Sequence, residues 1–188
     1  MKLSMRTSQL DARRMLRCSL ERIVIPELAK RGFTLLRRAS GAPPIWVFNR
    51  PRNDGGYDVL DLMMESGKRP HFDARINVVS EHGISRSWGA PIPAKEAMAC
   101  DSPVRIAIAR NAFQNRTFRA LARWVGIGWF GYKASGDPAL NERLAVASCV
   151  EFVSTLDQAE AWWSAKEFGP NLVKESIGVI HHSGNFSL

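Results

Sequence analysis

The sequence lacks the long apolar segments that membrane insertion and secretion require. No run of about 18 uncharged apolar residues occurs in it, so no transmembrane helix is expected. Its opening, MKLSMRTSQLDARRMLR, contains no apolar stretch of the kind that forms the centre of a secretory signal. Both absences predict a cytoplasmic protein that does not associate with a membrane.

Cysteine is scarce and unpatterned. Cys18, Cys100 and Cys149 are far apart in the chain and form no C-x-x-C pair. This spacing argues against the common disulfide frameworks and zinc sites. The sequence therefore predicts three buried thiols that act as small hydrophobic residues in a reducing compartment. Neither a metal nor a cofactor is expected.

Strong catalytic motifs are missing too. The sequence has no H-E-x-x-H, no G-x-S-x-G and no P-loop. A literal G-x-G-x-x-G spans residues 126–131, but a helix rather than a strand is expected before it. Its aromatic residues, Trp129 and Phe130, would crowd a bound pyrophosphate. An anchored turn is the better interpretation of this segment.

One set of charged residues resembles a metal-dependent nuclease site. It comprises Asp58, Asp61, Glu65 and Lys68. The common nuclease pattern is Glu-x-Lys, and here Glu65 and Lys68 are one residue too far apart. We therefore expect solvated charges at strand ends. The missing motifs favour binding over catalysis, and an enzyme of unrecognised type stays open as an alternative.

What the sequence does contain fits one α+β domain that covers residues 1–188. A chain of 188 residues has the length of one domain, and its 45% hydrophobic content is enough to bury a core. The spacing from Ser8 to Asp11 resembles a capping box and predicts a helix that follows it to about Arg31. Pro26 should kink or restart this helix.

A meander of strands should follow the helix. Four runs separated by turn residues have strand character: Phe33–Arg38, Ile45–Arg50, Tyr57–Glu65 and Phe72–Ser80. Such short connections favour antiparallel pairing. In the fourth run, apolar residues from Phe72 to Val78 alternate with polar ones, which predicts one face on the core and one face in water.

The second half should be mainly helical after a fifth strand. Residues 81–102 are expected to form a long loop, and Val104–Ile108 the fifth strand. Helices are expected at 112–125, from Asp137-Pro138 onward, again after a break at Thr155, and around 171–180. The predicted class is α+β, with an N-terminal helix, a mainly antiparallel sheet of four to five strands and a helical C-terminal half.

The net charge of +8 is unevenly distributed. Residues 1–60 hold 12 Lys and Arg against 5 Asp and Glu, whereas residues 134–188 hold 3 against 7. Three arginines share one face of the helix expected at 112–125: Arg116, Arg119 and Arg123. Two interpretations stay open. With Arg105 and Arg110 they could bind nucleic acid or an acidic protein, or they could form a solvated face paired with C-terminal acids.

Four further residues are candidates for binding. Arg13 and Arg17 lie on the wetter face of the expected first helix, and Trp88 lies in the long loop. Trp162 and Trp163 are adjacent on a helix, so their side chains point about 100° apart. One of them is expected to be partly exposed, with Trp162 the candidate binding anchor.

The segment Leu20–Phe33 resembles the opening of small bacterial α+β proteins of unknown function. The resemblance rests on Ile25, Pro26, Leu28, Gly32 and Phe33. Some of those families are similar to immunity proteins, which neutralise a toxin encoded beside them. The resemblance implies a non-enzymatic module whose partner is another protein. A small basic protein that binds nucleic acid is the alternative, and the oligomeric state stays open.

Overall fold

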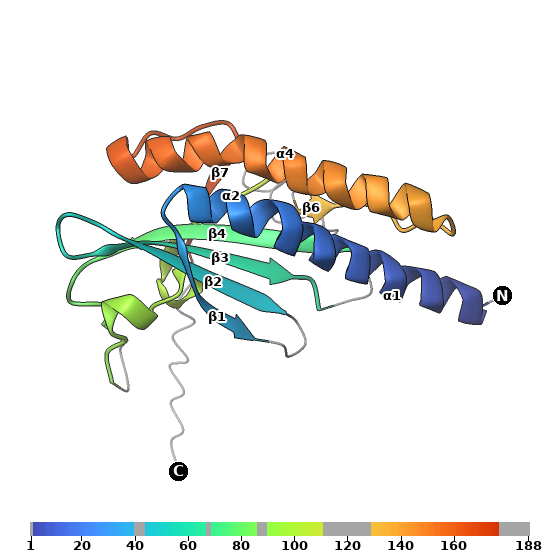
Figure 1. Cartoon of the computed structure of the whole chain (residues 1–188). Coiled ribbons are helices and arrows are strands. Elements are labelled where there is room, and N and C mark those ends of the chain that lie inside the picture. The colour runs from blue at the N-terminus through green and yellow to red at the C-terminus, as the bar shows by residue number, and fades with distance from the viewer. Residues whose placement is uncertain (1, 40–43, 67–68, 86–89, 111–128, 177–188) are drawn as a thin grey trace, which may run out of the picture.

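An antiparallel sheet and two long helices organise the described part of the chain. The computed structural model describes residues 2–39, 44–66, 69–85, 90–110 and 129–176. Helices α1 (Lys2–Ser19) and α4 (Pro138–Ala165) lie side by side over one face of the sheet and run in the same direction (Figure 1). Within the described ranges, no helix has the length and apolar character needed to cross a membrane.

The first helix begins earlier than the capping pattern predicted. It starts at Lys2, because residues 2–8 contain neither Pro nor Gly to stop it, so the expected start after Ser8 is wrong. The interruption predicted at Pro26 is confirmed. Leu20–Val24 forms a π turn in which the Ile25 N–H donates to Leu20 C=O, and α2 (Ile25–Lys30) restarts the α-helix with Pro26 in its first turn.

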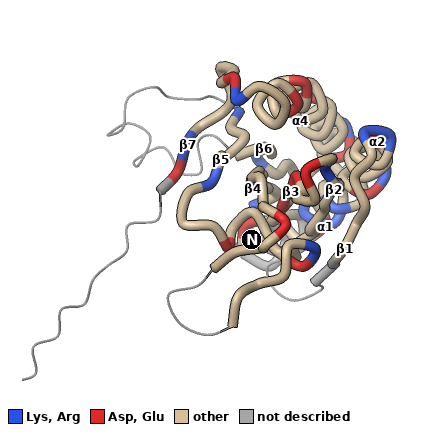
Figure 2. The backbone as a smooth tube through the Cα atoms, turned by 90° about the vertical axis from the view of Figure 1, so that its left-hand side faces the viewer, with Lys and Arg blue, Asp and Glu red and all other residues tan. Residues whose placement is uncertain are grey.

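The antiparallel meander is confirmed, and the sheet is larger than predicted. Among the described residues its seven strands are β1 (Thr34–Ala39), β2 (Ile45–Pro51), β3 (Tyr57–Met64), β4 (His71–Val79), β5 (Val104–Ile108), β6 (Phe130–Gly131) and β7 (Leu172–Ser176). The spatial order is β1-β2-β3-β4-β5-β7, and β6 pairs with β4. Strands β1 and β7 therefore form the two edges (Figure 2).

The main core lies between the helices and the sheet. As predicted, Phe72, Ala74 and Ile76 of β4 are fully buried on this side. Phe72 packs against Phe130 of β6 and Phe152 of α4, with ring centroids 5.5 and 5.4 Å apart. Aromatic rings at these distances attract each other beyond the area they bury. The G-x-G-x-x-G segment thus ends in a strand whose phenylalanine belongs to the core.

The C-terminal half differs from the prediction in two places. Helix α4 is continuous, because the Thr155 hydroxyl donates to the Phe152 carbonyl within the helix instead of capping a new one. The predicted helix around 171–180 is wrong at its start, where Leu172 and Val173 pair with β5 as part of β7. The helix expected at 112–125 lies outside the described residues.

The second face of the sheet is covered rather than exposed to water. Two 3-10 turns, η2 (Ala94–Glu96) and η3 (Ala99–Asp101), place alanines against Val59 and Val79 in a small second core. Asp73, predicted to face water, is only 7% exposed. The expected long loop at 81–102 therefore contains folded elements that close this face.

Candidate functional site

Several residues proposed for binding lie outside the described part of the chain. These are Arg116, Arg119, Arg123 and Trp88. The two arginines grouped with that stripe are described, and both are paired. Arg105 Nε lies 3.1 Å from Glu175 Oε2, and Arg110 Nε lies 2.7 Å from Glu151 Oε1. Arg105 and Arg110 therefore pair with acidic residues of the C-terminal part of the chain.

The candidate arginines of α1 make intramolecular contacts. Arg13 Nη2 donates to the Glu65 carbonyl oxygen at 2.8 Å and so ties α1 to the end of β3. Arg17 Nε lies 3.2 Å from Glu21 Oε1, one helical turn further on. Both residues can still contribute positive charge to the surface, but each guanidinium already has a partner within the chain.

The two neighbouring tryptophans are both buried. Trp162 is 7% exposed and Trp163 is 2% exposed, so the expected exposure of one of them is wrong. Trp163 Nε1 donates to the Asn77 carbonyl, whereas the Lys166 ammonium lies 4.3 Å from the centroid of the Trp162 ring. The two side chains point in different directions, as expected, but other parts of the chain bury both of them.

The acids that resemble a nuclease set are not brought together. Asp58 and Asp61 are buried on opposite faces of β3, so the expectation of solvated strand-end charges is wrong for both. Lys68 lies outside the described residues. No group of three His, Cys, Asp or Glu side chains in the described ranges could hold a metal ion.

Asp58 belongs to a network around Arg50. The Arg50 guanidinium binds Asp58 Oδ2 at 2.8 Å and both carboxylate oxygens of Glu160 at 2.9 Å. It also lies 4.6 Å from the ring centroid of Phe33 and 5.3 Å from that of Trp163. These contacts join β2, β3 and α4, which makes this network a structural clamp.

Asp61 anchors the cover on the outer face of the sheet. Its Oδ2 accepts a hydrogen bond from the Cys100 N–H at 2.9 Å, and burial raises the pKa of this carboxyl to about 6. On the same face, Arg75 Nη2 lies 2.6 Å from Asp73 Oδ2, and Glu175 Oε2 lies between Arg75 and Arg105. The strands thus enclose a row of alternating charges beneath an alanine-rich segment.

The three thiols differ sharply in exposure. Cys149 is buried, Cys100 is half-buried and Cys18 is exposed, so the prediction of three buried thiols is wrong for Cys18. Burial raises the pKa of Cys149 to about 12, and burial together with the charge of Asp61 raises that of Cys100 to about 12. Both thiols are therefore neutral near pH 7 and are weak nucleophiles.

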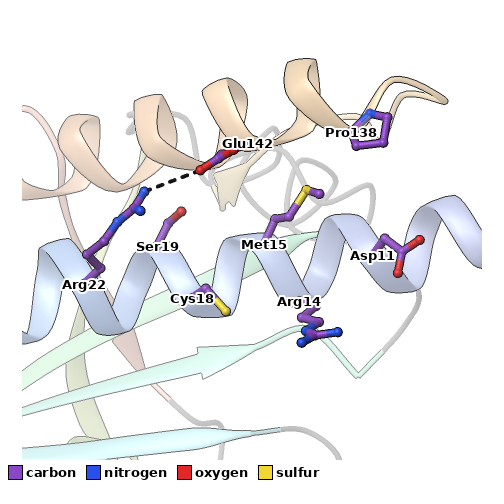
Figure 3. A pocket seen from close by; sticks show the side chains of 8 residues that line it. All are labelled: Asp11, Arg14, Met15, Cys18, Ser19, Arg22, Pro138 and Glu142. Atoms are coloured by element: carbon purple, nitrogen blue, oxygen red, sulfur yellow. Dashed lines mark ion pairs between the residues drawn. The ribbon is translucent and has the colours of Figure 1, made fainter.

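The exposed Cys18 lies in a groove between α1 and α4 (Figure 3). The hollow has a volume of about 290 Å³ and is lined by eight residues: Asp11, Arg14, Met15, Cys18, Ser19, Arg22, Pro138 and Glu142. Met15 points toward α4 and Pro138 faces it from the start of that helix (Figure 3). The lining of the groove therefore combines apolar side chains with charged side chains of both signs.

The charges of the groove balance each other. Arg22 Nη2 lies 3.8 Å from Glu142 Oε1 across the gap, and their side chains are 64% and 60% exposed. Asp11 and Arg14 are charged residues near the other end (Figure 3). An exposed pair at this distance contributes little to stability, so its groups are available to a partner.

Sequence reasoning missed this groove, although one half of it was readable. The α1 residues of the groove recur at helical spacing from Asp11 to Arg22, and Met15 is apolar within a basic face. The other half comes from the start of α4, more than 100 residues later in the chain. No local pattern in the sequence indicates that these two helices meet.

Comparisons with protein-family models, with curated proteins and with solved structures each gave no match for this chain.

Proposed function

We propose that this protein is a non-catalytic protein-binding module and that a partner inserts an apolar side chain into the groove between α1 and α4. The observation that carries the proposal is the composition of the groove. Met15, Cys18 and Pro138 supply apolar surface, and charged residues of both signs line the groove with them. Binding hot spots commonly combine apolar anchor contacts with polar contacts at their border that exclude water.

The position of the groove, open at the surface between two helices, favours a protein partner over a small molecule. Pockets for drug-sized ligands usually have volumes of about 300–1,000 Å³ and enclose most of the ligand. The groove holds about 290 Å³ and lies between two helices at the surface. It is large enough for one bulky side chain, while the exposed Arg22 and Glu142 at its border can contact the surface around that side chain.

The protonation states of the thiols also favour binding. A catalytic cysteine needs a lowered pKa, and those of Cys100 and Cys149 are raised to about 12. Cys18 is exposed, and in the groove it supplies a small apolar surface. Neutralisation of a toxin encoded beside this protein is the most concrete version of the proposal, because the Leu20–Phe33 segment resembles families related to immunity proteins.

The test is binding to a partner recovered with the protein from its native host, with the product of the neighbouring gene tried first. Cys18→Trp fills the groove at an exposed position and should weaken binding by at least about tenfold. Leu10→Trp is the matched control, since Leu10 is on the same helix, is 62% exposed and does not line the groove. Equal binding by both variants would exclude the groove as the site.

The purified protein itself also tests whether the function is binding to protein alone. If the purified protein carries a bound small-molecule substrate or cofactor, a module that only binds protein is contradicted. Circular dichroism of both variants should match the wild type, because neither substitution touches the main core.

A further inference from the structure

The side of α4 that faces away from the core has an uncharged stretch at its middle, with an exposed valine at the centre. Five exposed residues on this side recur at intervals of four or three positions: Arg143, Ala147, Val150, Ser154 and Asp157. At 100° per residue these positions form one seam, opposite the buried seam that contains Ala145, Phe152 and Ala159. Between its two charged ends the outer seam carries no charge, and Val150 is 53% exposed.

A surface helix normally presents charged and polar residues to water, so an exposed Val150 between Ala147 and Ser154 is a local exception. The one acid within the apolar stretch, Glu151, lies on the flank of the helix, where it pairs with Arg110 at 2.7 Å. The outer seam of α4 is therefore a helix face without a partner in the described part of the chain.

The seam is complementary to itself. Arg143 and Asp157 lie seven residues before and seven residues after Val150, which is two helical turns or about 10 Å in each direction. In two antiparallel helices that cross at Val150, each Arg143 would lie opposite the partner's Asp157. Charge complementarity of this kind arises on both sides of a two-fold axis, as an interface between identical surfaces requires.

We propose that a second copy of this chain docks antiparallel on the outer seam of α4 and forms a symmetric dimer. The spacing of 3.5 residues suits helices that cross at about 20°, the angle of coiled-coil packing. Ala147 and Ser154 flank the crossing point with small side chains, which lets the two helices approach closely.

The charged ends of the seam are accessible for these contacts. Arg143 is exposed and forms no ion pair with any described residue. The Asp157 side chain is 83% exposed and uses Oδ1 to bind Arg31 Nη1 at 2.8 Å, which leaves Oδ2 for a second partner. Because the contact spans only about four helical turns, it is smaller than a standard interface, so the dimer should dissociate on dilution. This inference does not depend on the groove between α1 and α4.

Sedimentation velocity of the full-length protein over a wide concentration range tests the dimer. The wild type should shift from monomer to dimer as concentration rises, and Val150→Arg should stay monomeric. Leu10→Arg is the matched control, because it places the same charge on a 62% exposed leucine of the other long helix and should leave the dimer intact. A wild type that is monomeric at every concentration, or a Val150→Arg variant that dimerises normally, overturns the proposal.

Charge reversal tests the contacts that define the arrangement. Arg143→Glu should raise the dissociation constant by about tenfold, because two carboxylates then face each other at both ends of the interface. Asp157→Arg should do the same, and the double variant should recover most of the affinity. A double variant that is weaker than both single variants would contradict the pairing.

Cross-linking tests the direction of the two helices. In a Cys18→Ser background, Val150→Cys should form a disulfide-linked dimer on mild oxidation, since the two thiols meet at the crossing point. Ser164→Cys should not, because antiparallel helices would hold those positions about 40 Å apart. Cross-linking at both positions would indicate a parallel pair and would overturn the proposed arrangement.

Discussion

The carboxylate of Asp61 on β3 accepts a hydrogen bond from the backbone N–H of Cys100, and this contact holds η3 against the outer face of the sheet. Asp61 is 3% exposed, and its second oxygen has no hydrogen-bond partner among the described residues. Burial therefore disfavours the ionised form and raises the pKa of this carboxyl to about 6. The nearby charges of Arg75 and the backbone donors of η3 only partly oppose that shift.

Asp61 should make the protein less stable as the pH rises from about 4 to about 6. Below this range the carboxyl is protonated in the folded and the unfolded chain. Within it the unfolded chain loses the proton first, so the free energy of unfolding falls by up to about 3 kcal/mol. Asp61→Asn keeps an acceptor for Cys100 without the charge, so its stability relative to the wild type should increase across this window.

Urea unfolding of both proteins at pH 4, 5, 6 and 7.5 measures this effect. Glu96→Gln, at an exposed position of η2, is the control and should show no comparable change relative to the wild type. A difference between Asp61→Asn and the wild type that stays constant over the whole range would show that the burial of Asp61 does not control its ionisation.

The three cysteines should react with thiol reagents at very different rates. Only Cys18 is exposed, whereas the pKa values of Cys100 and Cys149 are raised to about 12 by burial. We expect one rapidly titrated thiol in the native protein and three after unfolding. Mass spectrometry of the labelled protein identifies the site, and Cys18→Ser should abolish the rapid phase. A rapid phase that persists in this variant would contradict the exposure pattern.

Removal of Arg50 should destabilise the fold strongly. The Arg50 guanidinium binds the buried Asp58, binds Glu160 and lies over the rings of Phe33 and Trp163. Arg50→Ala should lower the free energy of unfolding by about 2–4 kcal/mol, because the buried Asp58 and the partly buried Glu160 each lose one partner and two rings lose a cation. Chemical denaturation measures the loss.

Two further variants provide a comparison for the loss of stability in Arg50→Ala. Arg50→Lys keeps the charge but cannot reproduce the forked hydrogen bonds, so an intermediate loss is expected. Arg52→Ala removes a contact of 2.9 Å to the same Asp58 and longer contacts to the exposed Asp54 and to the Trp163 carbonyl, and it should cost less than Arg50→Ala. If the two alanine variants are equally stable, the contacts of Arg50 to Glu160 and to the rings contribute nothing measurable.

The arginine stripe at 116, 119 and 123 stays a prediction from the sequence, and salt dependence tests it. If the three residues contact phosphates of duplex DNA, the log–log salt slope of the affinity should be roughly −2.7. Replacement of all three by Gln should flatten the slope, whereas Arg143→Gln should not change it by as much. No detectable DNA or RNA binding at low salt would exclude the nucleic-acid alternative.

The fold up to the fifth strand was largely readable from the sequence. The break at Pro26 follows from the missing N–H of proline, and Val104–Ile108 has the same bounds as predicted. Short turns between β-type runs required antiparallel pairing, because parallel strands need long crossovers. These features depend on local chemistry, so no knowledge of distant residues was needed.

The candidate site was much less predictable. The predicted anchor Trp162 is buried beside Lys166, and Arg13 and Arg17 have partners within the chain. The groove itself joins Met15 to Pro138, which are 123 positions apart in the sequence. A side chain on the polar face of a helix has the same sequence signature whether it is paired, covered or free.

The sequence by itself determined the α+β class, the interrupted first helix and the alternation that places Phe72 and Ile76 in the core, because each depends on backbone preferences over a few residues. Only the tertiary structure decided that β4 is covered on both faces, that residues 172–176 form a strand and that α1 and α4 enclose a groove. Each of these outcomes requires segments far apart in the chain to pack together, as when Cys100 reaches Asp61 or Leu172 pairs with Ile108. Burial of a second face is a property of those contacts, and no local pattern encodes it.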